Sequence, residues 1–348
     1  MSKLPKKPQR RTMLQGALAL GAVPMIMTEA RAQSTVKWRV QSHWPKASSS
    51  FDDSLVPLAK ELEERTGGRF KLELLGAGEV AKGAEIFNMV NRGVIPMGTT
   101  APAYNSQESE LLNMYMGIPG SLQEPWQMAY VTKIMGLEAA VNEDLKSKGR
   151  NVFYMAEKAY PTELVLKKEL KAGDDTGRIK IRSAGALIDY FHAAGFVPQN
   201  IDGPELYQAL ATGVIDGAHW GGAQGALSMK LWEVAKYHMM PSVLMANDVF
   251  IISTKAWDKL PDDLREIFRA LLDSWYYRRT TEYQYKEMQA LRKGVDDFGV
   301  KVEQYPEDVQ KDFSKATEQI LAKEMGKGPK AQEMGEKLQE FMQAVKVG

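Results

Sequence analysis

The chain contains no cysteine, and this absence excludes several classes of protein. Without thiols there is no disulfide scaffold, no cysteine nucleophile and no cysteine-ligated zinc or iron–sulfur site. An excess of charge of one sign is missing too, because 45 Lys and Arg residues face 44 Asp and Glu residues, for a formal net charge of +1. This near-equal number of basic and acidic residues argues against a nucleic-acid-binding protein, which presents a basic surface.

The sequence motifs of common enzyme classes are also missing. The four histidines are scattered, with no H-x-x-x-H or H-E-x-x-H spacing that would hold a metal ion. There is no G-x-S-x-G, no P-loop and no G-x-G-x-x-G, and we interpret Gly76-Ala77-Gly78 as a turn. We therefore expect a binding protein and not an enzyme.

Residues 1–32 have the pattern of an export signal. Basic residues precede a mostly apolar run, Met13 to Met27, and Ala30-Arg31-Ala32 forms an A-x-A cleavage site. Arg10-Arg11 resembles a twin-arginine signal, with a general secretory signal as the alternative. We expect cleavage after Ala32 and a periplasmic location. The segment holds six basic residues and one acidic residue, so the remaining 316 residues have 39 basic and 43 acidic residues, a net charge of −4.

Strand-like and helix-like patterns alternate along the rest of the chain, which predicts an α/β fold with parallel strand pairing. The expected strands are 36–40, 70–75, 94–98, 152–155, 163–167, 180–182, 214–218 and 249–253. The expected helices are 51–66, 84–91, 186–194, 205–212 and 261–298. The last helix is unusually long, so it either braces two domains or breaks near Gly294.

Three segments have the residue types of a ligand site. Arg182 ends a strand just before a turn, where its guanidinium can form two parallel hydrogen bonds with a carboxylate. Trp220 follows the strand at 214–218 and precedes Gly221-Gly222, which permits a ligand to approach closely. The loop 99–105, which contains Tyr104, follows the third expected strand.

Two of these segments carry a resemblance to a known family. Residues 177–182 read GRIKIR, and residues 198–217 read PQNIDGPELYQALATGVIDG. They resemble the signature segments of the DctP family, the extracytoplasmic solute-binding proteins (family 7) of TRAP transporters. The Trp220 turn is most similar to that of the subgroup that binds 2-oxo acids and lactate.

The resemblance implies a two-lobed periplasmic-binding-protein fold, with a small organic acid bound between two α/β lobes and a long bracing helix. It places lobe I at 36–154 plus 249–287 and lobe II at 155–248 plus 288–348. It also implies delivery of the acid to the membrane permease subunits of a TRAP transporter. Arg182 matches the arginine that pairs with the substrate carboxylate, and Trp220 and Tyr104 match ligand-binding residues of the subgroup.

The sequence departs from the subgroup at two positions that hold a bridging cation there. His219 stands in place of an acidic residue beside the tryptophan, and Met245 stands in place of a second carboxylate. Because Na⁺ and Ca²⁺ need oxygen ligands, we expect no metal or cofactor, with a bridging Na⁺ or Ca²⁺ ion as the alternative. His219 either presents a hydrogen bond or part of a positive charge directly to the substrate, or is a packed, hydrogen-bonded wall residue.

Further candidate ligand contacts come from three places in the chain. They are Lys158, Tyr160 and Thr162 in the segment 157–163, Trp44 after the first strand, and Asn247 and Asp248 just before the strand at 249–253. The expected ligand is a monocarboxylate, a 2-oxo or 2-hydroxy acid, with a dicarboxylate or an aromatic acid as the alternative. Two functions of another class stay open, an exported hydrolase or lyase and a ligand sensor.

Overall fold

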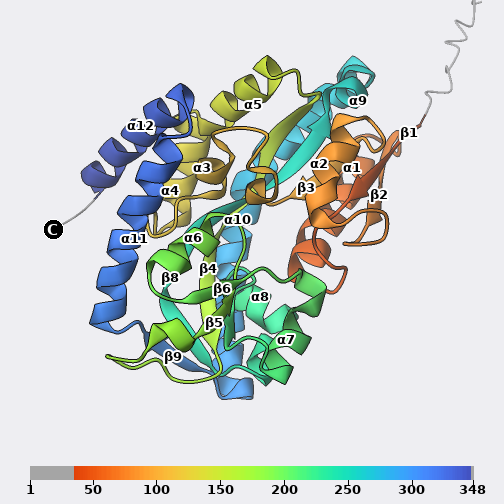
Figure 1. Cartoon of the computed structure of the whole chain (residues 1–348). Coiled ribbons are helices and arrows are strands. Elements are labelled where there is room, and N and C mark those ends of the chain that lie inside the picture. Colours follow the sequence, from red (N-terminus) through yellow and green to blue (C-terminus); the bar gives the residue numbers. More distant parts are fainter. Residues whose placement is uncertain (1–34, 346–348) are drawn as a thin grey trace, which may run out of the picture. The chain divides into compact units, whose positions relative to one another are not determined.

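The computed structural model describes residues 35–345, so the expected export signal lies outside the described residues. The described chain has an α/β fold (Figure 1). Its strands are β1 (Val36–Gln41), β2 (Phe70–Leu75), β3 (Met97–Thr100), β4 (Val152–Leu166), β5 (Lys180–Arg182), β6 (Val197–Gln199), β7 (Gly217–Ala218), β8 (Tyr237–Ser253) and β9 (Lys301–Gln304). Its α-helices are α1 (Val56–Arg65), α2 (Ile86–Asn91), α3 (Leu112–Met116), α4 (Pro125–Ala129), α5 (Leu137–Ser147), α6 (Ala186–Ala193), α7 (Leu206–Thr212), α8 (Ala223–Ser228), α9 (Thr254–Asp258), α10 (Asp262–Phe298), α11 (Glu307–Met325) and α12 (Pro329–Val345).

The strands form one mixed sheet with the order β2-β1-β3-β8-β4-β7-β5-β6, and β9 pairs with β8. The pairs β1–β2, β1–β3, β5–β6 and β5–β7 are parallel, as the alternation of strands and helices predicts. The connecting pairs β3–β8, β4–β8 and β4–β7 are antiparallel. Two parallel units are therefore joined through the antiparallel pair β4–β8.

The two long strands differ from the prediction. Residues 152–155 and 163–166 belong to a single 15-residue strand, β4, and 249–253 is the end of the 17-residue strand β8. Both strands are buried over most of their length, so they lack the alternation of polar and apolar residues that marks a half-exposed strand. Pro161 also lies within β4, where a proline argues against a continuous strand.

Helix α10 runs for 37 residues without a break, from Asp262 to Phe298. It packs along β4 (Figure 1). Gly294 does not interrupt it, because this glycine makes room for a neighbouring side chain: a Cβ there would lie 2.8 Å from the ring of Trp232. The helix ends instead at Gly299, whose φ of 64° is the left-handed conformation that favours glycine.

The buried apolar residues lie around both parallel units. Trp38, Leu58, Phe70 and Phe268 pack together beside β1 and β2, and Ile181, Phe191 and Phe313 pack together beside β5. The C-terminal α12 contributes Met334 and Leu338 to a cluster that also contains residues of α3 and α5.

The residue boundaries of the two lobes stay a prediction. Of the helices in residues 35–345, none combines the length and the apolar character needed to cross a membrane.

Candidate binding site

A cavity lies where the carboxyl ends of strands from both parallel units meet the middle of β4 and β8. Its wall consists of His43, Trp44, Ser48, Ser49, Ser50, Ala101, Ala103, Tyr104, Met116, Gly117, Tyr160, Thr162, Arg182, Ala184, Ala186, Leu187, His219, Trp220, Gly221, Gly225, Leu244, Asp248 and Tyr283. The segments after β1, β3, β5 and β7 supply most of these residues. Loops at the carboxyl ends of parallel strands are the usual place for a ligand in α/β proteins. The cavity volume is about 80 Å³.

Arg182 ends β5, and its side chain is held by backbone oxygens. Its Nε donates to the carbonyl of Ile201 at 3.0 Å, and Nη1 donates to the carbonyl of His219 at 3.3 Å. The residue is only 4% exposed, and among the described residues no carboxylate lies within ion-pair distance of it. A buried guanidinium in a fixed orientation is thus part of the cavity wall, with hydrogen-bonding capacity for an anion.

Trp220 lies beside Arg182 and packs on a glycine. The centre of its ring is 5.1 Å from the guanidinium carbon of Arg182. A Cβ on Gly203 would lie 2.3 Å from Cη2 of the indole, so the ring occupies the space that any larger residue would need. Gly225 is similarly required, since a Cβ there would lie 1.5 Å from the carbonyl oxygen of Trp220. The glycines around Trp220 therefore fix the position of the ring.

His219 is buried and stacks near Phe191, with ring centres 6.3 Å apart. Burial lowers the pKa of His219 well below its usual value, and the positive charge of Arg182 lowers it further. The imidazole is therefore neutral at neutral pH. Its Nε2 lies 3.4 Å from the hydroxyl oxygen of Ser183. A neutral His219 is compatible with a wall residue and with a hydrogen bond to a ligand, but not with a positive charge presented to the ligand.

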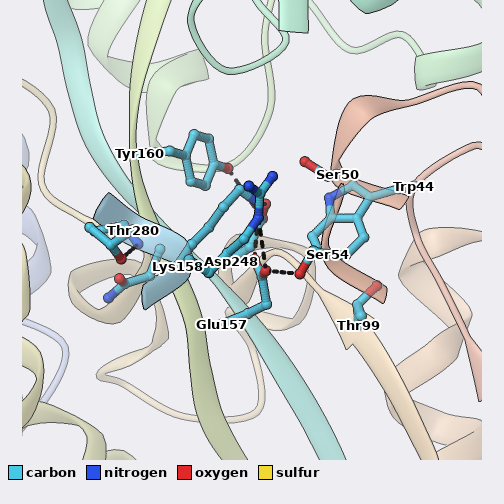
Figure 2. A network of polar contacts seen from close by, with 12 residues as sticks. Trp44, Ser50, Ser54, Thr99, Glu157, Lys158, Tyr160, Asp248 and Thr280 are labelled. Carbon is cyan, nitrogen blue, oxygen red and sulfur yellow. Dashed lines mark hydrogen bonds and ion pairs between the residues drawn. The ribbon is translucent and has the colours of Figure 1, made fainter. Parts of the chain in front are cut away.

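Lys158 and Asp248 form a buried ion pair beneath the cavity (Figure 2). Nζ of Lys158 lies 2.7 Å from Oδ2 of Asp248 and 3.0 Å from Oε2 of Glu157. The rings of Trp44 and Tyr160 flank the ammonium group, with centres 4.5 Å and 4.8 Å away. The structure places Lys158 behind the cavity wall, where it contacts wall residues instead of lining the cavity itself.

Two further groups face Asp248 from the cavity wall. The hydroxyl of Tyr160 donates to Oδ1 at 3.2 Å, and Nε2 of His43 lies 3.5 Å from the same oxygen. Burial alone would raise the pKa of Asp248, but Lys158 and His43 outweigh it and hold this pKa well below its usual range. Asp248 is therefore ionised at neutral pH.

The structure brings together most of the residues that the sequence predicts for the site. Arg182, Trp220, Tyr104, His219, Tyr160 and Trp44 all line the cavity. Asn247 does not. Its Nδ2 donates to the carbonyl of Tyr115 and to the hydroxyl of Thr132, and its Oδ1 accepts a hydrogen bond from Tyr276.

The candidates Thr162 and Asp248 also line the cavity, as does His43, to which sequence reasoning gave no role. Asp248 and Asn247 are neighbours in β8, and consecutive side chains of a strand point to opposite faces. The choice between the two positions needs the register of β8 against β4. Asp248 pairs with Lys158 in that register, and this buried lysine is the signal that could have identified the acidic partner.

A second group of buried acids lies behind the Trp220 turn. A Cβ on Gly222 would lie 2.5 Å from Oε2 of Glu287 and 2.9 Å from Oε2 of Glu163, so both carboxylates approach the turn closely. Oε2 of Glu163 also accepts a hydrogen bond from Nε2 of His238 at 2.7 Å. Burial raises the pKa of Glu287 to about 8, and the negative charge of Glu163 contributes.

Comparisons with known proteins agree on one family. The model of the bacterial extracellular solute-binding proteins, family 7 (DctP), matches residues 41–327. The chain is 25% identical over 312 residues to a monocarboxylate 2-oxoacid-binding periplasmic protein of Nostoc sp.. The aligned region covers 89% of this chain and 85% of the relative.

Solved structures show the same fold. A TRAP transporter solute-binding protein from Bordetella bronchiseptica, with calcium and picolinate in its site, has a TM-score of 0.81 at 23% identity, over 89% of this chain and 93% of that one. A TRAP periplasmic solute-binding protein from Pseudoalteromonas atlantica, with sodium and pyruvate, has a TM-score of 0.80 at 21% identity, over 90% and 95%. The fold of the chain is that of the two-lobed TRAP solute-binding proteins.

Proposed function

Because the chain belongs to the bacterial extracellular solute-binding proteins of family 7, we propose that it captures a small organic acid in the periplasm and delivers it to the permease subunits of a TRAP transporter. The signal-like residues 1–32 support export, with cleavage after Ala32 and the twin-arginine route as parts of the proposal. The relative from Nostoc is named a periplasmic protein, which favours the same compartment.

The observation that carries the proposal is the unpaired guanidinium of Arg182 in the cavity wall. Two backbone carbonyls orient it, and it has no acidic partner among the described residues. A buried charge without a partner is unfavourable, so the cavity favours a ligand that brings a carboxylate. Trp220 and Trp44 supply apolar surface for the carbon skeleton, and Tyr104 supplies a hydroxyl.

The charges of the wall favour a monocarboxylate over a dicarboxylate. Arg182 can pair with one carboxylate, whereas the next charged group of the lining is the anion Asp248. A second carboxylate of the ligand would meet this negative charge at close range.

A hydrolase or lyase would need a nucleophile beside a base. Two hydroxyls lie beside a histidine of the cavity wall: the hydroxyl oxygen of Thr99 is 2.9 Å from Nδ1 of His43, and that of Ser183 is 3.4 Å from Nε2 of His219. Both hydroxyl residues are fully buried and absent from the cavity wall. Neither can reach a ligand, and we propose a receptor without catalytic activity.

A thermal-shift screen of small carboxylic acids, each paired with its methyl ester, tests the proposed function. We expect one or a few monocarboxylates to raise the melting temperature, and their esters to leave it unchanged, because an ester has no anion for Arg182. Calorimetry then gives the affinity, and nuclear magnetic resonance of the recovered ligand shows whether it is intact. Equal binding of acid and ester, or a reaction product, would contradict the proposal.

A further inference from the structure

We propose that Asp248 is a second recognition group of the cavity, and that it selects acids which carry a hydrogen-bond donor. The donor is a hydroxyl or an amide N–H, and the disfavoured acids have a carbonyl or ether oxygen in the same place. This inference rests on the proposed function, since it requires an acid held by Arg182 in the same cavity.

The position of Asp248 carries the first step. Its side chain is 5% exposed and lines the cavity, so what little surface it has faces the ligand. The wall already directs Tyr160 and His43 at Oδ1, while Oδ2 faces Lys158. Each carboxylate oxygen can accept about two hydrogen bonds. Oδ2, with one partner among the described residues, therefore has capacity for a second donor.

The charge of Asp248 carries the second step. The Lys158 ammonium is fully buried and lies between Asp248 and Glu157, so it stabilises the ionised form of Asp248. An ionised carboxylate accepts hydrogen bonds and donates none. Lys158, which the ligand does not displace, thus fixes the preference of Asp248 for a hydrogen-bond donor.

The other polar groups of the wall impose no such preference. Tyr104 and Thr162 have hydroxyls, which can turn to donate or to accept. Arg182 only donates, and the ligand carboxylate satisfies it. Among the described residues that line the cavity, Asp248 is the only carboxylate. It is therefore the only side chain there that requires a hydrogen-bond donor from the ligand.

The consequence is discrimination between ligands of nearly equal size. A ligand carbonyl oxygen placed against Asp248 would bring two acceptors together with no hydrogen between them, and would leave the ligand oxygen without a hydrogen bond in a largely buried site. Sites that hydrogen-bond a particular ligand group reject analogues without that group far more strongly than apolar walls reject an extra methylene. We expect at least a tenfold preference for the donor in a matched pair.

Isothermal calorimetry on the unmodified protein with three matched pairs tests the inference. The pairs are lactate and pyruvate, 3-hydroxybutyrate and acetoacetate, and pyroglutamate and its lactone analogue, in which the ring N–H is replaced by oxygen. Tighter binding of the donor acid by tenfold or more, in each pair that binds, supports the inference. Equal binding, or tighter binding of the acceptor acid, overturns it and leaves the proposed function intact.

If none of the six acids binds, the inference that the cavity selects small acids with a hydrogen-bond donor is also overturned. The broader screen of acids and esters would then decide separately on the proposed function. Asp248→Asn adds a second readout, because an amide both donates and accepts. We expect the preference within a pair to fall below about threefold, with the affinity for the acceptor acid retained. A preference in Asp248→Asn equal to that of the parent would contradict a recognition role.

Two further variants serve as a fallback and as a control for this measurement. If Asp248→Asn does not fold, the double variant Lys158→Gln with Asp248→Asn removes both charges of the pair, leaves Glu157 with Arg279 at 4.0 Å, and allows the same measurement. Asp189→Asn is the matched control, since Asp189 forms an exposed ion pair with Lys323 away from the cavity wall. It should keep the preference of the parent, and loss of the preference in Asp189→Asn would show that the readout is not specific to Asp248.

Discussion

The indole of Trp220 rests directly on the backbone of Gly203, so closely that a Cβ on the glycine would lie 2.3 Å from the ring. The same ring lies 5.1 Å from the guanidinium carbon of Arg182. Gly203 begins the helical turn before α7, and Arg182 ends β5. Gly203, which has no side chain, thus leaves the space in which the ring of Trp220 packs beside the guanidinium of Arg182.

Gly203→Ala should weaken ligand binding about tenfold, because the added methyl group must push the ring of Trp220 towards Arg182 or out of the cavity. Calorimetry with the best acid of the screen measures the loss. Gly326→Ala is the matched control, as the nearest atom to a Cβ there is 3.5 Å away. An affinity of Gly203→Ala equal to that of the control would show that the contact does not position the ring.

Glu287→Gln should stabilise the protein above pH 8. Burial, together with the charge of Glu163, raises the pKa of Glu287 to about 8, against a usual value of 4.5. Between these two values the folded state holds a proton that the unfolded state has released, so stability falls as pH rises and the loss is complete above pH 8. Each unit of pKa difference corresponds to about 1.4 kcal/mol.

Thermal melts of the parent and of Glu287→Gln at pH 5 and pH 9 measure this effect. The variant should melt at least roughly 3 °C above the parent at pH 9, since ~1 kcal/mol moves the midpoint by about 2–4 °C in a chain of this size, and the gap should shrink at pH 5. His238, Glu163 and Tyr283 also face this region and stay unchanged in the comparison. Glu340→Gln, on the exposed face of α12, serves as control. A gap that does not depend on pH would contradict the assignment.

Lys158→Met should destabilise the fold by about 3–5 kcal/mol, because it leaves Asp248 and Glu157 buried without their shared cation. Denaturation in urea, monitored by circular dichroism, gives the change in unfolding free energy. Lys323→Met removes an exposed ion pair with Asp189 and should cost less than about 1 kcal/mol. Similar losses for the two variants would mean that the buried pair adds little.

Removal of cations should leave ligand affinity within about twofold. Lys158 already supplies a cation to Asp248, and the resemblance to the 2-oxo-acid subgroup implies that His219 and Met245 stand in place of its oxygen ligands. Among the described residues, no group of three or more histidine or acidic side chains could hold a metal ion. Calorimetry after dialysis against a chelator, in potassium buffer without sodium, measures the effect. A large loss that Ca²⁺ or Na⁺ restores would support the alternative of a bridging cation.

Local patterns were sufficient to predict much of the fold. Val36–Gln41 and Phe70–Leu75 alternate as half-buried strands do, and the structure pairs them in parallel. The long helix was predicted almost to its ends because Pro261 and Gly299 mark them. The extent of β4 and β8 was missed, since a strand buried on both faces has no alternation to detect.

The site was predictable where one residue carries its own chemistry. Arg182 and Trp220 stand beside turns and belong to segments with a family signature, and both line the cavity. The sequence offered Asn247 and Asp248 together but could not choose between them, because the role of Asp248 depends on Lys158, 90 residues earlier in the chain, and on the register between two strands. Asn247, one position away, points to Tyr115 and Thr132 instead.

The affinity of Arg182→Ala for the best acid of the screen tests the central claim most directly. We predict a loss of about 100-fold or more, since a charge-assisted, bidentate pair is among the strongest polar contacts, and Arg182→Lys should recover only part of it. Arg178→Ala, at an exposed arginine paired with Asp175, is the control and should bind like the parent. Circular dichroism should show the same fold for all variants. If folded Arg182→Ala binds the acid as tightly as the parent does, the carboxylate is held elsewhere and the account is wrong.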